Sequence, residues 1–374
     1  MHRDPVTLAL PEVAAKYAPL VVLHGDEKLL PSSADRFVAR SCLRWATGRG
    51  LDGDEVPTAP GDVDASRLGA ASRDPYRMES HIASALTRPL DDHAARRGDP
   101  PLEQGFFLRL RKEADARGDK STSPDPSVYT GSTTFYDYDA DAKALTYWLF
   151  YPGSSPPLGI LRASEQVGVR TRGAGGQPSA EGPPDVVEAA VAAATLEEFA
   201  LAYPGLSLEA EPAVGTRGFG GDVLQRLRVV AEGVRALLRA DDVLHEGDWE
   251  RITVYLDEAN PGQATPAAVA FYRHSTNTFR AWEEVEKEAE THPVVYSAIG
   301  SHASLPSPGY GFVDVGDADG PRWRTWEPED ALVSIVEQPW YGFGGAWGRL
   351  GRVRDATGPL GPGAHWKHAA PRPG

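Results

Sequence analysis

Three features are scarce in this chain of 374 residues, and each scarcity excludes a class of protein. The chain has one cysteine, Cys42, so it can form neither an intramolecular disulfide nor a zinc site built from several thiolates. No run approaches the roughly 18 apolar residues of a membrane span, and the first residues hold no sustained apolar segment, so we expect a cytoplasmic protein without a transmembrane segment. Acidic residues outnumber basic ones, and the resulting net charge of −15 argues against a nucleic-acid partner.

Two common catalytic signatures are also missing. The chain has no Gly-x-Ser-x-Gly turn, and the adjacent Ser301 and His302 do not by themselves make a nucleophile with its base. The glycine-rich stretch at 172–176 lacks the Lys-Ser/Thr ending of a phosphate-binding loop. We therefore interpret that stretch as a surface loop.

The pattern of apolar residues predicts a protein made mainly of strands. Aromatic and β-branched residues predict strands at 20–23, 133–138, 144–151, 251–257, 267–274 and 292–299. Helices are predicted at 78–97, 185–202 and 221–240, together with one that Ser33 or Asp35 caps and that runs through about Thr47. Tryptophans of the Gly- and Pro-rich tail are expected to pack over the sheet: Trp323, Trp326, Trp340, Trp347 and Trp366.

The expected fold class is α+β, mainly β. Its centre would be an antiparallel β-sandwich with peripheral helices and long irregular loops. We expect one β-rich domain over 1–374, in which a helical and loop-rich part at 1–127 packs on a sandwich core at 128–374.

The most informative stretch is Leu-His-Glu-Gly-Asp-Trp-Glu-Arg-Ile-Thr-Val-Tyr-Leu-Asp at 244–257. In a strand, Asp248 and Glu250 share one face, about 6.6 Å apart, and Trp249 points to the other face. If Gly247 bends the chain, His245 can swing back over the two carboxylates. Carboxylate oxygens and an imidazole that converge suit a divalent cation, so His245, Asp248 and Glu250 are candidate metal ligands. A solvated acidic turn is the alternative.

Other polar residues are weaker candidates. Asp137 has strand spacing and can reach a cation, although an aspartate-rich hairpin turn explains it as well. Glu246, His274 and His302 are candidates for proton transfer, the two histidines because they stand at predicted strand ends, where structural roles are also common. A polar cluster at 24–27 is interpreted as a solvated turn.

A set of ordered motifs gives a family resemblance along nearly the whole chain. The sequence resembles the family of vacuolar protein sorting-associated protein 62, which also includes a large group of uncharacterised plant proteins. The motifs that carry the resemblance are Tyr17-Ala18-Pro19, Asp26-Glu27, Leu30-Pro31-Ser32-Ser33, Tyr147-Trp148-Leu149-Phe150-Tyr151-Pro152, His245-Glu246-Gly247-Asp248-Trp249-Glu250, Tyr272-Arg273-His274-Ser275, Pro293-Val294-Val295-Tyr296-Ser297-Ala298, Gly300-Ser301-His302-Ala303, Gly345-Ala346-Trp347-Gly348 and Gly361-Pro362. This family implies little about activity.

The chain also resembles, more distantly, the necrosis- and ethylene-inducing-like cytolysins. That resemblance implies a β-sandwich with flanking helices and a divalent cation, with His245, Asp248 and Glu250 as ligands. Two departures weaken it: the second histidine of the cytolysin motif falls on Gly247, and an upstream aspartate falls on Leu237. We carry over the fold and the cation, and not the toxicity.

Two functions remain open from the sequence. The first is a metal-dependent hydrolase or lyase that acts on a polar small molecule or glycan, with Ca²⁺ or Mg²⁺ polarising a substrate oxygen. The second is a non-catalytic module for a carbohydrate or a lipid head group, in which the cation bridges to the ligand or is structural. The shape of the site and the state of its histidines would separate the two.

Overall fold

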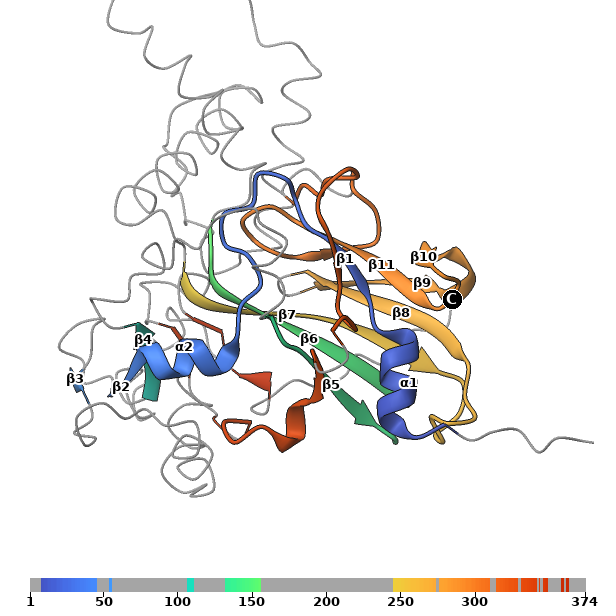
Figure 1. The fold of residues 1–374 in the computed structure, drawn as a ribbon, viewed down its shortest axis with the longest axis horizontal. Helices are drawn as coiled ribbons and strands as arrows, with labels where there is room; N and C mark the ends of the chain where they lie inside the picture. The colour runs from blue at the N-terminus through green and yellow to red at the C-terminus, as the bar shows by residue number, and fades with distance from the viewer. Residues whose placement is uncertain are drawn as a thin grey trace, which may run out of the picture.

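The computed structural model describes residues 8–45, 54–55, 106–110, 132–155, 245–273, 276–309, 314–328, 331–341, 343, 346–348, 358–359 and 361–362. These residues form two short α-helices and three sheets (Figure 1). The mainly β class with peripheral helices is thus confirmed. The sheets are mixed, because each contains one parallel pair of strands among antiparallel ones.

The first helix, α1 (Leu10–Tyr17), was not predicted. Pro11 stands in its first turn, where a missing N–H costs nothing. The Glu12 carboxylate accepts a hydrogen bond of 2.8 Å from the backbone N–H of Ala9. The helix buries Val13, Ala14 and Tyr17, so its short length is offset by tertiary packing.

The second helix, α2 (Ala34–Arg40), is shorter than predicted. Ser33 caps it by accepting the N–H of Arg36, as the sequence suggests. The predicted extension to Thr47 is wrong, because the chain turns directly into strand β2 (Ser41–Trp45). All five residues of β2 pair with strand β4 (Phe106–Leu110), and this distant pairing overrides the local helical pattern.

The largest sheet has six strands in the order β14-β5-β6-β7-β8-β9. Its central pair, β6 and β7, is antiparallel over ten residue pairs. The strands span β5 (Thr134–Asp139), β6 (Ala144–Ser154), β7 (His245–Leu256), β8 (Pro266–Arg273), β9 (Thr276–Ala281) and β14 (Leu332–Ser334). Four predicted strands fall within these elements, and β7 begins earlier than predicted, at His245.

A second sheet packs across one face of the first (Figure 1). Strand β1 (Leu20–Val22) lies between β11 (His292–Ser297), to which it is parallel, and β13 (Arg322–Arg324). Two short strands, β10 (Lys287–Glu288) and β12 (Ser304–Leu305), pair with β11. The N-terminal part therefore supplies a central strand of the sandwich.

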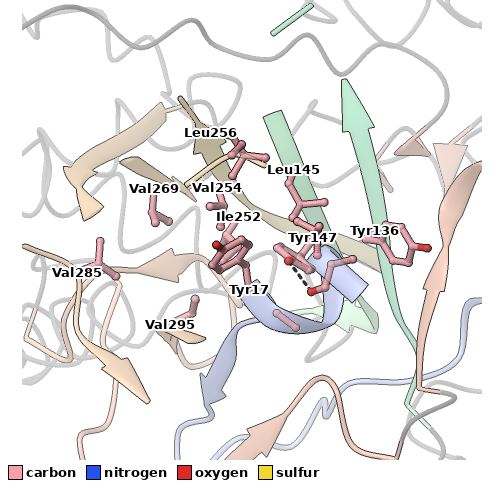
Figure 2. Close-up of a cluster of buried hydrophobic side chains, with 14 of the residues drawn as sticks. Tyr17, Tyr136, Leu145, Tyr147, Ile252, Val254, Leu256, Val269, Val285 and Val295 are labelled. Atoms are coloured by element: carbon pink, nitrogen blue, oxygen red, sulfur yellow. Dashed lines mark hydrogen bonds between the residues drawn. The ribbon is translucent and has the colours of Figure 1, made fainter. Parts of the chain in front are cut away.

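The core between the two sheets is continuous with α1. Tyr17 of the helix, Tyr147 and Ile252 of the large sheet, and Val295 of β11 belong to one buried cluster (Figure 2). The Tyr147 hydroxyl donates a hydrogen bond of 2.7 Å to the Ala14 carbonyl oxygen, drawn as the dashed line in Figure 2. This bond ties α1 to the centre of the sheet.

The opposite face of the large sheet carries an aromatic core. Phe150 and Trp249 pack there with Phe37 of α2 and with Trp340 and Trp347 of the tail. The tail also contributes a strand, β15 (Ala346–Trp347), to a small sheet ordered β15-β4-β2-β3, in which β3 is Asp54–Glu55. The expected packing of tail tryptophans over the sheet is confirmed for these two.

Two single-turn 3₁₀ helices complete the described part, η3 (Trp282–Glu284) and η4 (Ile335–Glu337). The predicted helices at 78–97, 185–202 and 221–240 lie outside the described residues, as does Trp366.

Candidate functional site

Charged residues, most of them buried, meet at one end of the sandwich, between its two sheets. Because β1 and β11 are parallel neighbours, the segments that follow them leave the sheet at the same edge. Glu27 lies in the segment after β1, and His302 lies in the turn after β11. Across from them, β7 contributes Asp248 and Glu250, and β6 contributes Tyr151, which pairs with Asp248.

His302 is the centre of the cluster. It is 1% exposed. Its Nδ1 lies 2.9 Å from Oδ2 of Asp248, and its Nε2 lies 3.5 Å from Oε2 of Glu27. The imidazole stacks on the Tyr151 ring, with centroids 3.9 Å apart and planes 5° from parallel. The backbone of His302 has φ = +55°, a left-handed conformation that few side chains adopt readily.

The two carboxylates keep this imidazole charged. Burial alone would lower the pKa of His302, but the charges of Glu27 and Asp248 and the hydrogen bond to Asp248 outweigh it and raise the pKa to about 9. Burial would likewise raise the pKa of Glu27, but the charge of His302, whose Nε2 lies close by without a hydrogen bond, and the backbone hydrogen bonds from Gly300 and Leu29 lower it to about 2. At neutral pH, His302 is therefore an imidazolium between two carboxylates.

Glu250 is in a different electrostatic state. Burial, then repulsion from Asp248 and Asp314, raises its pKa well above the usual value, and the neighbouring Arg251 offsets only part of this. No hydrogen bond joins the Glu250 carboxylate to another residue in the described part of the chain. A carboxylate in such surroundings either takes up a proton or attracts a cation.

Asp314 closes the cluster from the second sheet's side and is fully buried. Its Oδ1 accepts a hydrogen bond of 2.6 Å from the Ser301 hydroxyl. Its Oδ2 lies 3.9 Å from Nε of Arg273, at the end of β8. Asp314 thus has a partial counter-charge, whereas Glu250 forms no ion pair with any of the residues that the structure describes.

Arg251 lies on the opposite face of β7. Its guanidinium sits over the rings of Tyr272, at 3.9 Å, and Trp148, at 5.2 Å. Its pKa is lowered, chiefly by burial. Because strand neighbours alternate between faces, Arg251 balances Glu250 only through the sheet and leaves the site itself rich in carboxylates.

The structure brings together three of the predicted site residues, Asp248, Glu250 and His302. It places Asp137 elsewhere: on β5, Asp137 pairs with Thr146, whereas Asp248 pairs with Tyr151. Five residues of β6 correspond to about 16 Å along the strand. Asp137 also shares a face with Phe135, which packs on Trp249 on the far side of the sheet.

The other predicted residues make contacts of their own or are not described. His245 lies at the start of β7 with Nδ1 2.8 Å from the carbonyl oxygen of Gly247. The Glu246 carboxylate accepts a hydrogen bond of 3.2 Å from the N–H of Leu110, on the small third sheet. The left-handed φ of +61° at Gly247 breaks the strand alternation between these residues and Asp248. His274 lies outside the described residues.

Sequence reasoning missed two members of the cluster. Glu27 was interpreted as part of a solvated turn, yet its side chain is 4% exposed. Asp314 lies in a glycine-rich segment without strand periodicity. The signals for Glu27 are its position after a short apolar strand and the place of Asp26-Glu27 among the motifs of the family resemblance. Neither signal points to Gly300 and His302, which are more than 270 positions away.

The donors available fit a hard cation better than a transition metal. Asp248 and Glu250 offer carboxylate oxygens, which Mg²⁺ and Ca²⁺ prefer. Within the described residues, however, no group of three or more His, Cys, Asp or Glu side chains is arranged to hold a metal ion. The expected trio of His245, Asp248 and Glu250 is therefore not assembled as a ready-made centre.

Comparisons with known proteins add no identity. No family model, curated protein or solved structure matches the chain. Among the helices in the described ranges, none has the length and apolar character needed to cross a membrane.

Proposed function

We propose that the protein binds a divalent cation of the Mg²⁺ or Ca²⁺ type between the carboxylates of Asp248 and Glu250. The observation that carries this proposal is that both carboxylates lie on one face of β7 and that Glu250 has neither a hydrogen bond nor an ion pair among the described residues. Burial and repulsion from Asp248 and Asp314 also raise the pKa of Glu250. Of the described cationic groups near the pair, His302 lies between two carboxylates and Arg273 lies beside Asp314, so a bound cation would supply a counter-charge to Glu250.

The small number of available carboxylates favours a partly hydrated ion. Mg²⁺ in proteins is commonly held by one or two carboxylates and keeps several water molecules. A pair formed by Asp248 and Glu250 suits this pattern and does not need a third side chain. The expectation of His245 as a ligand is not required by the proposal.

The contacts that the candidate bases make favour ligand binding over catalysis. His302 is charged and has both nitrogens directed at carboxylates, so it is a poor base at neutral pH. The Glu246 carboxylate accepts a hydrogen bond from the backbone of β4. We therefore infer a module in which the cation bridges to an oxygen-rich ligand, such as a carbohydrate or a lipid head group.

A metal-dependent hydrolase or lyase is the second candidate, and one observation favours it. The pKa of Glu250 is raised, chiefly by burial, in the direction that lets a carboxyl group act as a general acid. A cation at the pair would lower that pKa again, so the two roles of Glu250 exclude each other at any one moment.

Cation binding is tested by thermal unfolding of the full chain. With EDTA the melting temperature should fall, and Mg²⁺ or Ca²⁺ should restore it, because an ion at about 100 times its Kd stabilises the folded state by about 2.7 kcal/mol. Glu250→Gln should abolish the response. Asp137→Asn is the matched control and should keep it, since Asp137 lies on the other face of the sheet.

The same variants also give a prediction for the melting temperature of the metal-free protein. In EDTA, Glu250→Gln should melt above the wild type at pH 7, because the substitution removes a carboxylate that is repelled in the folded state. The proposal fails if neither ion shifts the wild-type melting temperature, or if Glu250→Gln responds as the wild type does.

A further inference from the structure

Glu27 is fixed more firmly than a side chain in a solvated turn needs to be. Its Oε1 accepts hydrogen bonds from the backbone N–H groups of Lys28 and Leu29, at 2.7 and 2.8 Å. Its Oε2 accepts one of 2.6 Å from the N–H of Gly300, in the turn after β11. Three backbone donors thus orient the carboxylate, and they leave Oε2 facing Nε2 of His302.

His302 passes this orientation on to Asp248. The ring is stacked on Tyr151, which fixes its plane, and its two nitrogens lie between Glu27 and Asp248. The contact with Asp248 involves Oδ2 alone. A carboxylate held through one oxygen keeps its second oxygen in a defined direction, which a metal ion requires of a ligand.

We propose that Glu27 is a positioning residue of the cation site, which acts through His302 to set the direction of the Asp248 carboxylate. This inference rests on the proposed function and names a residue that touches no cation itself. Carboxylates that bind metal ions are themselves hydrogen-bonded to outer partners, which orient them. His302 would be such a partner for Asp248, and Glu27 would orient the partner.

The position of the His302 ring depends on its contacts on both sides. Without the Glu27 carboxylate beside Nε2, the ring would lose one of the two groups between which it lies. The direction of the Asp248 carboxylate, which the ring contacts through Nδ1, would then be less well defined.

The experiment is a calorimetric titration of the full-length chain with Mg²⁺, repeated with Ca²⁺. Glu27→Gln should raise the Kd for the cation about 10- to 100-fold, which is the usual effect of losing an outer partner of a metal ligand. Glu288→Gln is the matched control, because Glu288 also pairs with a cationic side chain, Arg324 at 2.7 Å, but on the surface. It should change the Kd by less than about 2-fold.

Two further readings separate positioning from general stability. The melting temperature in EDTA shows whether a variant is folded, and Glu27→Asp, which keeps the charge on a shorter side chain, should recover part of the affinity. The ring-nitrogen NMR signals of His302 should shift when Mg²⁺ is added to the wild type, and less so in Glu27→Gln.

Each outcome decides something. A folded Glu27→Gln chain that binds Mg²⁺ and Ca²⁺ with the wild-type Kd overturns the positioning role and leaves the cation site standing. A wild-type chain that binds neither ion overturns both. If Glu27→Gln does not fold, Glu27→Asp decides: wild-type affinity together with unchanged His302 signals overturns the role, and weakened affinity in a folded chain supports it.

Discussion

The buried contact of His302 with Glu27 and Asp248 predicts a distinctive dependence of stability on pH. The pKa of His302 is about 9 in the folded protein, against 6.5 for an ordinary histidine. A group whose pKa is raised on folding contributes stability that is fully present below its unfolded pKa and is lost as pH rises through its folded pKa. The window for this loss therefore runs from about pH 6.5 to pH 9.

The size of the effect follows from the two pKa values. The difference between 6.5 and about 9 corresponds to about 3 kcal/mol, at 1.36 kcal/mol for each pKa unit. The same attraction also lowers the pKa of Glu27 to about 2, so the two shifts describe one interaction and are not added. On the acid side, this contribution is present above about pH 4.5 and is lost as pH falls toward 2.

The perturbation is His302→Asn, chosen because asparagine tolerates the left-handed backbone at this position better than most residues. Urea unfolding in EDTA, followed by tryptophan fluorescence, gives the free energy of unfolding at pH 6, 7.5 and 9.5. We expect the wild type to lose about 3 kcal/mol more than the variant over this range. At pH 6 the variant should be less stable by about 3–5 kcal/mol, because two buried carboxylates lose their partner.

A second histidine provides the control. His292 stacks on Trp326 and hydrogen-bonds to the Ala18 carbonyl oxygen rather than to a carboxylate. His292→Asn should follow the wild-type pH dependence. If His302→Asn showed the same loss between pH 6 and 9.5 as the wild type, the charged state of His302 derived from the geometry would be refuted.

Two more substitutions test the framework around the site. Gly247→Ala should lower the free energy of unfolding by more than about 2 kcal/mol, because the Gly247 backbone is left-handed and a Cβ there would collide with the Trp347 carbonyl oxygen. The control is Gly309→Ala, which has open space around it and should change the free energy of unfolding by less than about 0.5 kcal/mol. Equal effects of the two substitutions in urea unfolding would contradict this. Tyr147→Phe should cost about 1–3 kcal/mol, since it leaves the buried Ala14 carbonyl oxygen without its hydroxyl donor; an unchanged urea midpoint would show that α1 does not depend on this bond.

The strands of the large sheet could be predicted because their signal is local. Alternation in β7 puts Asp248 and Glu250 on one face and Trp249 on the other, and the packing of Trp249 with Phe150 agrees. Distances within one strand need no knowledge of the rest of the chain. The same reasoning cannot tell which face of a neighbouring strand a residue occupies, and so it grouped Asp137 with residues on the other side of the sheet.

The members of the cluster that were missed depend on pairing between distant segments. Glu27 meets His302 only because β1 lies parallel to β11, which brings the segments after both strands to one edge. No spacing in the sequence reports that pairing. The helix predicted through Thr47 failed for a related reason: residues 41–45 find partners in 106–110, and these partners are decided by the fold.

Two costs meet at His302, and together they favour a role beyond folding. A left-handed backbone at a non-glycine residue costs free energy and tends to persist at functional sites. Buried ion pairs are often no more stabilising than apolar residues of similar volume, so a contact of this kind is weak evidence for stability alone. A purely structural join between β7 and the turns after β1 and β11 would be served as well by packed apolar side chains, such as those that fill the core around Ile252. A site that must hold a carboxylate in a fixed direction needs charged side chains around it. This requirement accounts for the left-handed backbone and the buried ion pairs that meet at His302.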